Sequence, residues 1–299
     1  MKILVTGSTG LVGSALLPSL KSQGHEVFRL VRSEAKAGPT EIYWNPKKGI
    51  EDASRLEGFD AVVHLAGENI SDGRWTEEKK ARIRDSRVEG TRRLSDALAR
   101  LTQPPRALLC ASAIGYYGDR GDEIMREEDE PGKGFLADVC REWEAATASA
   151  EQKGIRVVKL RFGVILSPKG GALSKMLAPF QFGVGGRLGS GRQYMSWITL
   201  DDVVGVINHA LVNETVSGPI NVVAPNPVTN LQFTKTMGRV LKRPTIFPVP
   251  AFAIRLAFGE MGDAALLAST RVEPARLKES GYTFKHPELE SALRQLLNK

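Results

Sequence analysis

The chain has 299 residues, 42% of them hydrophobic, and a formal net charge of +7, so it is long and apolar enough to bury a sizeable core. No apolar run is long enough to cross a membrane, and no signal peptide is expected because Lys2 leads directly into a core strand. Cys110 and Cys140 both fall in apolar segments, which favours a reduced, cytoplasmic protein over a disulfide framework. The four histidines are scattered without metal-ligand spacing, so no metal site is expected.

The positive charge admits nucleic acid, an anionic surface or phosphorylated small molecules as partners. Most basic residues are interleaved with acidic ones, as in residues 76–85, which is typical of a solvated helix face. We therefore expect neither nucleic acid nor a membrane as a partner. We expect a monomer or homodimer whose basic residues surround a phosphate-rich cofactor and an unidentified small-molecule ligand.

The first predicted element is a dinucleotide-binding turn. An apolar strand over Lys2–Thr6 runs into three glycines, and a helix over Leu11–Gln23 follows. In such a turn the first glycine permits the tight bend, the second lets the backbone approach a pyrophosphate, and the third lets the helix pack closely on the strand. The helix N-terminus then offers N–H groups to the phosphates. The residues expected to contact the cofactor here are Gly7, Thr9, Gly10, Leu11, Val12 and Gly13.

The second predicted strand, Glu26–Val31, is followed by Arg32 and Ser33. A site selective for NAD has an acidic residue here that binds the ribose 2′-hydroxyl, whereas an arginine favours a 2′-phosphate. The alternative is an arginine that is simply solvated after a strand. We expect Val31, Arg32 and Ser33 to contact the cofactor, and NADP(H) to be preferred over NAD(H).

Strands and helices continue to alternate, which indicates parallel βαβ units. The next expected elements are strands over Ile42–Trp44, Ala61–Leu65, Ala107–Ala111 and Val157–Leu166, and helices over Glu77–Leu101 and Phe135–Gln152. After these we expect a helix over Ala172–Phe182, a glycine-rich loop over Gly183–Gln193, a helix over Thr199–Val212, a strand over Ile220–Val223, and short helices that include Phe252–Phe258 and Pro287–Leu297.

The pattern predicts an α/β fold: a Rossmann-type doubly wound parallel sheet with a smaller, mainly helical C-terminal domain on the substrate side. Residues 1–166, with a return at about 197–224, would form the NADP-binding domain. Residues 167–196 and 225–299 would form the smaller domain.

Four motifs resemble the extended branch of the short-chain dehydrogenase/reductase superfamily, which includes nucleotide-sugar epimerases and dehydratases. They are Thr6–Gly13, Asp60–Gly67, Ser112–Gly118 and Trp197–Asp202. The chain is more closely similar to an atypical "epimerase family" group, through Ala66–Asn69, Arg74-Trp75, Ser86-Arg87, Gly185–Gln193 and Arg271–Pro274.

Further cofactor contacts are expected outside the glycine turn. Leu65, Ala66 and Gly67 end a predicted strand, where the backbone passes close to the cofactor. The resemblance implies that Arg87 points toward the cofactor and that Val164 lies at its nicotinamide end. Glu68 either lies near this pocket or is a surface carboxylate.

The superfamily's reaction uses a Tyr-x-x-x-Lys pair, in which the lysine lowers the tyrosine pKa and the tyrosine exchanges a proton with the substrate. In this chain the corresponding positions hold Leu136 and Cys140, and residues 135–144 contain neither Tyr nor Lys. The candidate catalytic residues that remain are Ser112 and Tyr116. Ser112 either orients a substrate or caps a helix or turn. Tyr116 and Tyr117 either supply a surrogate acid or pack and stack beside the cofactor.

The glycine-rich segment 183–192 carries Arg187 and Arg192. In nucleotide-sugar enzymes the corresponding segment crosses the substrate's diphosphate, and glycine N–H groups with arginines suit such an anion. The alternatives are a flexible lid or a connecting loop with solvated arginines.

Two functions remain open from the sequence. The first is an NADP(H)-binding oxidoreductase or epimerase-like protein that acts on nucleotide-linked or other small carbonyl or hydroxyl substrates. The second is a non-catalytic NADP(H)-binding sensor or scaffold that has lost the Tyr–Lys pair.

Overall fold

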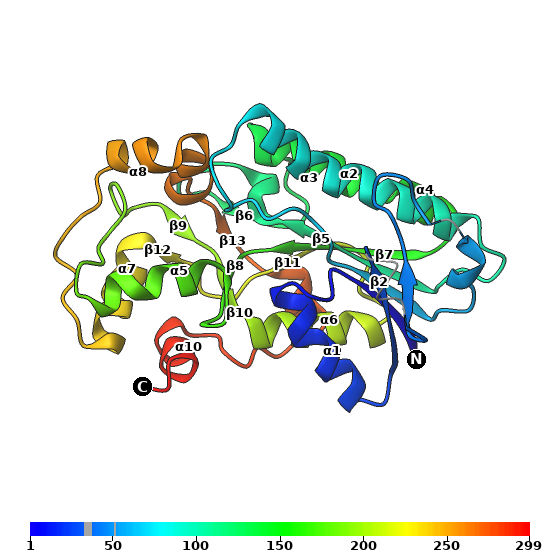
Figure 1. Cartoon of the computed structure of the whole chain (residues 1–299). Coiled ribbons are helices and arrows are strands. Elements are labelled where there is room, and N and C mark those ends of the chain that lie inside the picture. Colours follow the sequence, from blue (N-terminus) through cyan, green and yellow to red (C-terminus); the bar gives the residue numbers. More distant parts are fainter. Residues whose placement is uncertain (33–37, 51) are drawn as a thin grey trace.

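A computed structural model describes residues 1–32, 38–50 and 52–299, and a seven-stranded parallel sheet is its centre (Figure 1). The strand order is β11-β7-β5-β4-β1-β2-β3, so the chain winds outward in both directions from the β1/β4 pair, as in a Rossmann fold. The predicted fold class is therefore confirmed. The strands are β1 (Lys2–Thr6), β2 (Glu26–Val31), β3 (Glu41–Tyr43), β4 (Ala61–His64), β5 (Ala107–Ala113), β7 (Arg156–Phe162) and β11 (Gly218–Val222).

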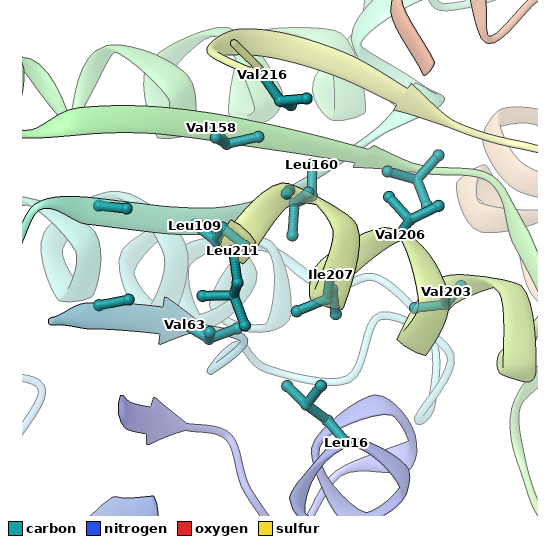
Figure 2. Close-up of a cluster of buried hydrophobic side chains, with 14 of the residues drawn as sticks. Leu16, Val63, Leu109, Val158, Leu160, Val203, Val206, Ile207, Leu211 and Val216 are labelled. Atoms are coloured by element: carbon teal, nitrogen blue, oxygen red, sulfur yellow. The ribbon is translucent and has the colours of Figure 1, made fainter. Parts of the chain in front are cut away.

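Helices cover both faces of this sheet, because the strands carry apolar side chains on alternate sides that are both buried. Helices α1 (Leu11–Ser22) and α6 (Leu200–Val212) lie on one face, and α2 (Glu77–Ala99), α3 (Phe135–Ala145) and α4 (Ala148–Gln152) lie on the other (Figure 1). On the first face, Val203, Val206 and Ile207 of α6 pack over the central strands (Figure 2). On the second face, Leu94 and Leu98 of α2 pack in the cluster that contains Leu4.

Two predicted elements are each divided in two. The expected strand over Val157–Leu166 breaks at Gly163, where a Cβ would lie only 2.5 Å from the Ser196 carbonyl oxygen. Beyond this close approach β8 (Val164–Leu166) pairs with β10 (Trp197–Thr199) instead of the main sheet. The expected helix over Phe135–Gln152 is interrupted at residues 146–147, where the Thr147 hydroxyl donates to the Glu144 carbonyl at 2.8 Å.

The rest of the chain forms a mainly helical region with its own hydrophobic cluster, centred on Trp197, Phe180, Phe233 and Met237. It contains α5 (Gly171–Gln181), α7 (Asn230–Leu241), α8 (Ala251–Phe258), the π-helical segment η4 (Gly262–Leu267), α9 (Ala275–Glu279) and α10 (Leu289–Leu296). The short strand pairs β9 (Tyr194–Met195) with β12 (Val228–Thr229), and β6 (Ile124–Met125) with β13 (Arg271–Val272), also lie outside the main sheet. The predicted division into two domains stays a prediction, and this cluster also includes Leu166, Trp197 and Ala224 of the first predicted domain.

The sequence analysis did not identify α7, although a signal for it is present. The Thr229 side chain accepts from the Gln232 N–H, and the Gln232 side chain accepts from the Thr229 N–H, which is a capping box. Among the described residues, no helix is both long and apolar enough to cross a membrane.

Candidate functional site

The glycine turn forms as the sequence predicts, and Gly7 and Gly13 each have a distinct steric reason. Gly7 has a φ of +65°, and a Cβ there would lie 2.6 Å from the Leu65 carbonyl carbon. A Cβ on Gly13 would lie 2.3 Å from the Gly7 carbonyl oxygen, so α1 packs against the turn only without a side chain. Gly10 is exposed and is the N-cap of α1, with no side chain capping the helix. The start of α1 can therefore receive an anion, with Thr9, Leu11 and Val12 beside it.

A buried hydrogen-bond chain holds the end of β4 against this turn. The Thr6 hydroxyl oxygen accepts from the backbone N–H groups of Leu65 and Ala66, both at 3.1 Å. Because this oxygen already accepts twice, the hydroxyl donates to Nδ1 of His64 at 2.7 Å, and the opposite ring nitrogen donates to the Thr91 hydroxyl at 3.1 Å. Burial lowers the pKa of His64 to about 4, so the ring stays neutral. The sequence analysis missed this chain, because its members are far apart in sequence.

Arg87 lies on α2 beside the same strand end. A Cβ on Gly67 would lie 3.4 Å from the guanidinium carbon of Arg87. The same carbon lies 5.1 Å from the centre of the Trp143 ring, over which the guanidinium stacks. Its Nη1 donates to the carbonyl oxygens of Glu68 and Ile83 at 3.0 and 3.1 Å. Arg87 thus fixes the backbone after β4 and places a positive charge at the edge of the sheet where the glycine turn lies.

Arg32 is exposed directly after β2, next to the strand that leads into the glycine turn, and Val31 is half-buried. Ser33 lies outside the described residues. Glu68 is close to this region: its carboxylate accepts from Lys79 at 2.8 Å. This hydrogen bond, with the charges of Lys79, Arg82 and Arg32, holds the pKa of Glu68 below its usual range.

Ser112 lies at the carboxyl end of β5 but is almost fully buried, with 2% of its surface exposed. Its hydroxyl donates to Oε1 of Glu144 at 2.7 Å, and Arg161 donates to both oxygens of the same carboxylate at 2.8 and 2.9 Å. Arg161 and Glu144 form a buried, bidentate ion pair. Removing one partner of such a pair destabilises a protein. Ser112 therefore contributes to a polar network beneath the edge of the sheet, and its role toward a substrate stays a prediction.

Tyr116 and Tyr117 follow on the 3₁₀ turn η3 (Ile114–Tyr117) and differ in environment. Tyr117 is fully buried; its hydroxyl lies 2.8 Å from Asn221 Oδ1 and accepts from Arg161, and burial raises its pKa. Tyr116 is half-buried, and its ring covers the Arg161 guanidinium at 3.6 Å. In the described part of the chain, the Tyr116 hydroxyl has no hydrogen-bond partner. Of the two, only Tyr116 presents a phenol that a ligand can reach.

Leu136 and Cys140 lie on α3 directly against this turn. A Cβ on Gly115 would be 3.3 Å from Leu136 Cβ and 3.8 Å from Cys140 Sγ. Burial raises the pKa of Cys140 to about 12, so it remains a thiol. The two positions that the sequence analysis assigns to the superfamily's Tyr and Lys therefore hold no proton-transfer group here. Val164, at the start of β8, is half-buried.

The glycine-rich segment is closely packed against another part of the chain. A Cβ on Gly186 would lie 1.6 Å from the Phe247 carbonyl oxygen, and the Val249 N–H donates to the Arg187 carbonyl at 2.8 Å. Arg187 Nη1 donates back to the Gly189 carbonyl at 2.7 Å, whereas Arg192 is exposed. Most of the glycines here permit close packing, so the segment is not built as a free lid.

The fold and the turn together define a Rossmann-type dinucleotide-binding protein. The model of the NAD dependent epimerase/dehydratase family matches residues 3–224, and the chain belongs to this family. A model described as a domain of unknown function matches residues 249–296.

Several known proteins are similar over the whole chain. The epimerase family protein Mb2239 of Mycobacterium bovis is 46% identical over 97% of this chain and 96% of its own. The human epimerase family protein SDR39U1 is 38% identical over 99% of this chain and 100% of its own.

Two solved structures are also similar. Human SDR39U1 (isoform 2), crystallised with NADPH, has a TM-score of 0.90 and 35% identity, with both chains fully covered. A nucleoside-diphosphate sugar epimerase from Corynebacterium glutamicum has a TM-score of 0.82 and 40% identity, and covers 99% of this chain but 58% of its own.

Proposed function

We propose that this protein binds NADP(H) at the glycine turn and acts as an oxidoreductase or epimerase-like enzyme on a small carbonyl or hydroxyl compound. The observation that carries the proposal is the uncapped N-terminus of α1 at Gly10, flanked by a turn that only glycines can form. Helix N–H groups and the helix dipole suit the pyrophosphate there. The human relative crystallised with NADPH supports the same cofactor.

The preference for NADP(H) rests on Arg32, which is exposed after β2 where NAD-selective sites have an acid. Its guanidinium would pair with the 2′-phosphate. Arg87 and the backbone of residues 65–67 would lie along the dinucleotide.

When bound, the nicotinamide supplies or accepts a hydride. The chain itself has to hold the substrate and to provide a proton at its oxygen. Tyr116 is the group that we assign to this proton, because its hydroxyl is unengaged in the described structure and its ring rests on Arg161. Ser112 would act indirectly, by holding Glu144 and therefore Arg161 beneath the ring.

Calorimetric titration of the purified protein with NADPH and NADH tests the cofactor. We expect NADPH to bind more tightly, and Arg32→Ala to remove roughly 1.5–3 kcal/mol of that preference, the range for a charge-assisted hydrogen bond. Arg93→Ala, on an exposed arginine of α2, is the matched control and should leave both affinities unchanged. Equal affinities for the two cofactors would refute the assignment.

A metabolite panel followed through NADPH fluorescence tests the chemistry. Turnover that Tyr116→Phe abolishes supports the enzyme. Ligand binding without any turnover would favour the sensor.

We also propose a cytoplasmic protein, as a monomer or homodimer. The two cysteines support a reducing compartment, since both are buried free thiols.

A further inference from the structure

We propose that the ligand bound beside the nicotinamide is an apolar carbonyl compound, with an aryl or alkyl body, and not a nucleotide sugar. The inference rests on the proposed function, because it takes the nicotinamide end of NADP(H) to lie at the carboxyl ends of β4 and β5.

The first observation is an apolar cluster around Leu136, the residue in the place of the superfamily's tyrosine. Trp75, Ile83 and Met261 form its buried part, and Leu136 is one of the partly exposed residues packed against them; the others are Ile70, Phe135 and Ala264. The rings of Trp75 and Phe135 meet edge to face at 5.2 Å. The cluster draws on the loop after β4, on α2, on α3 and on η4, so both parts of the fold contribute apolar atoms.

The second observation is that three polar groups near this cluster, on Trp75, Lys80 and Arg74, are engaged within the protein. The Trp75 indole N–H donates to the Ile70 carbonyl at 2.8 Å. Lys80 pairs with Glu260 at 2.8 Å, and Arg74 donates to the Leu256 carbonyl. A sugar brings several hydroxyl groups that lose water on binding, and each one left without a partner weakens binding.

The third observation concerns the diphosphate of a nucleotide sugar. The glycine-rich segment that would cover it is fastened to residues 247–249, and the Arg187 guanidinium donates to the segment's own Gly189 carbonyl. A diphosphate would have to displace this contact. An apolar ketone would leave this contact in place. Its binding would be favoured by the apolar surface of the cluster that it removes from water.

Ligand-observed NMR on the NADP⁺-saturated protein tests the inference, with 4-phenyl-2-butanone and UDP-glucose as the probes. We expect saturation transfer to the ketone, and affinity for UDP-glucose at least about tenfold weaker, the factor that corresponds to 1.4 kcal/mol. Leu136→Asn should weaken ketone binding by about tenfold, because it places an amide against the ligand. Leu136→Met, which keeps the apolar volume, should restore it.

Val212→Asn, on an exposed residue of α6, is the control and should change neither ligand. Ile70→Asn, on a loop, repeats the test if Leu136→Asn fails to fold. UDP-glucose binding more tightly than the ketone, no ketone binding, or ketone binding unaffected by both cluster variants would each overturn the inference. Failure to bind NADP⁺ in the preceding calorimetry would instead refute the proposed function, so the two failures are distinguishable.

Discussion

Single residues at this site are often held by partners distant in sequence, and His64 is the clearest case. Its neutral ring connects Thr6 under the glycine turn to Thr91 on α2, and it is fully buried in strand β4. Protonation would put a charge in the core and replace the acceptor that the Thr6 hydroxyl needs. The cofactor turn is therefore coupled to the protonation state of one core histidine.

We predict that His64 makes the protein less stable in mild acid. Its pKa falls from 6.5 to about 4 on folding, so the unfolded chain binds the proton more tightly. The free energy of unfolding should be unaffected by His64 above pH 6.5 and should decrease as the pH falls from 6.5 toward 4. The decrease amounts to about 3 kcal/mol, at 1.36 kcal/mol per pKa unit.

Urea unfolding of the wild type and His64→Asn at a series of pH values measures this. The variant should be less stable at neutral pH, and its stability should depend less on pH between 6.5 and 4. His25→Asn, on a half-buried histidine directly before β2, is the control. Parallel curves for wild type and His64→Asn would contradict the prediction.

At the scale of elements, close backbone contacts decide where strands and loops go. β7 ends just before Gly163, where the Ser196 carbonyl oxygen lies 2.5 Å from the position of a Cβ. Gly186 likewise lets the glycine-rich segment pack against residues 247–249. In both cases the absent side chain lets two distant segments meet. The sequence predicts a phosphate-binding segment, a lid or a connecting loop over residues 183–192, and glycine spacing alone does not indicate this packing.

We therefore predict that Gly186→Ala destabilises the protein by roughly 1–3 kcal/mol, the range for an overpacked site, because its Cβ would overlap the Phe247 carbonyl. Gly90→Ala is the matched control. Gly90 lies in α2, and a Cβ there would be 3.9 Å from the nearest atom outside the helix backbone, in the Trp44 ring. The substitution should be neutral or should stabilise the protein by about 0.5–1 kcal/mol. Thermal and urea unfolding compare the two. A Gly186→Ala protein as stable as the wild type would show that the segment can move freely.

At the scale of the whole molecule, Asp202 fastens the C-terminal segment to the Rossmann part. Its buried carboxylate accepts from the Thr199 and Tyr282 hydroxyls at 3.0 Å, and from the N–H groups of Lys285 and His286 at 2.8 and 3.0 Å. Asp201, beside it, is exposed. Asp202, in the first turn of α6, thus holds residues 282–286 in place.

We predict that Asp202→Asn lowers the free energy of unfolding by about 3 kcal/mol, because an amide N–H would face buried donors and leave at least one unsatisfied. Asp201→Asn should change it by less than about 0.5 kcal/mol, as is usual for surface substitutions. Hydrogen exchange of residues 282–286 should increase only in Asp202→Asn. Equal effects of the two substitutions would contradict the role of the buried carboxylate.

The sequence by itself determined the parallel α/β fold, the glycine turn and the absence of Tyr and Lys from their usual places. These follow from local spacing: apolar alternation, glycines at fixed intervals, and residue identity within one helix. Helix α7 was also within reach, through its capping box.

Only the tertiary structure decided which groups Ser112, Tyr116 and Arg187 contact. Ser112 turned out to be joined to Glu144 and Arg161, which are 32 and 49 residues away in the sequence. The Arg187 carbonyl accepts from the N–H of Val249, which is 62 residues further along. A side chain's hydrogen-bond partner and its burial depend on which segments the fold brings together, and periodicity along the chain carries no record of such contacts.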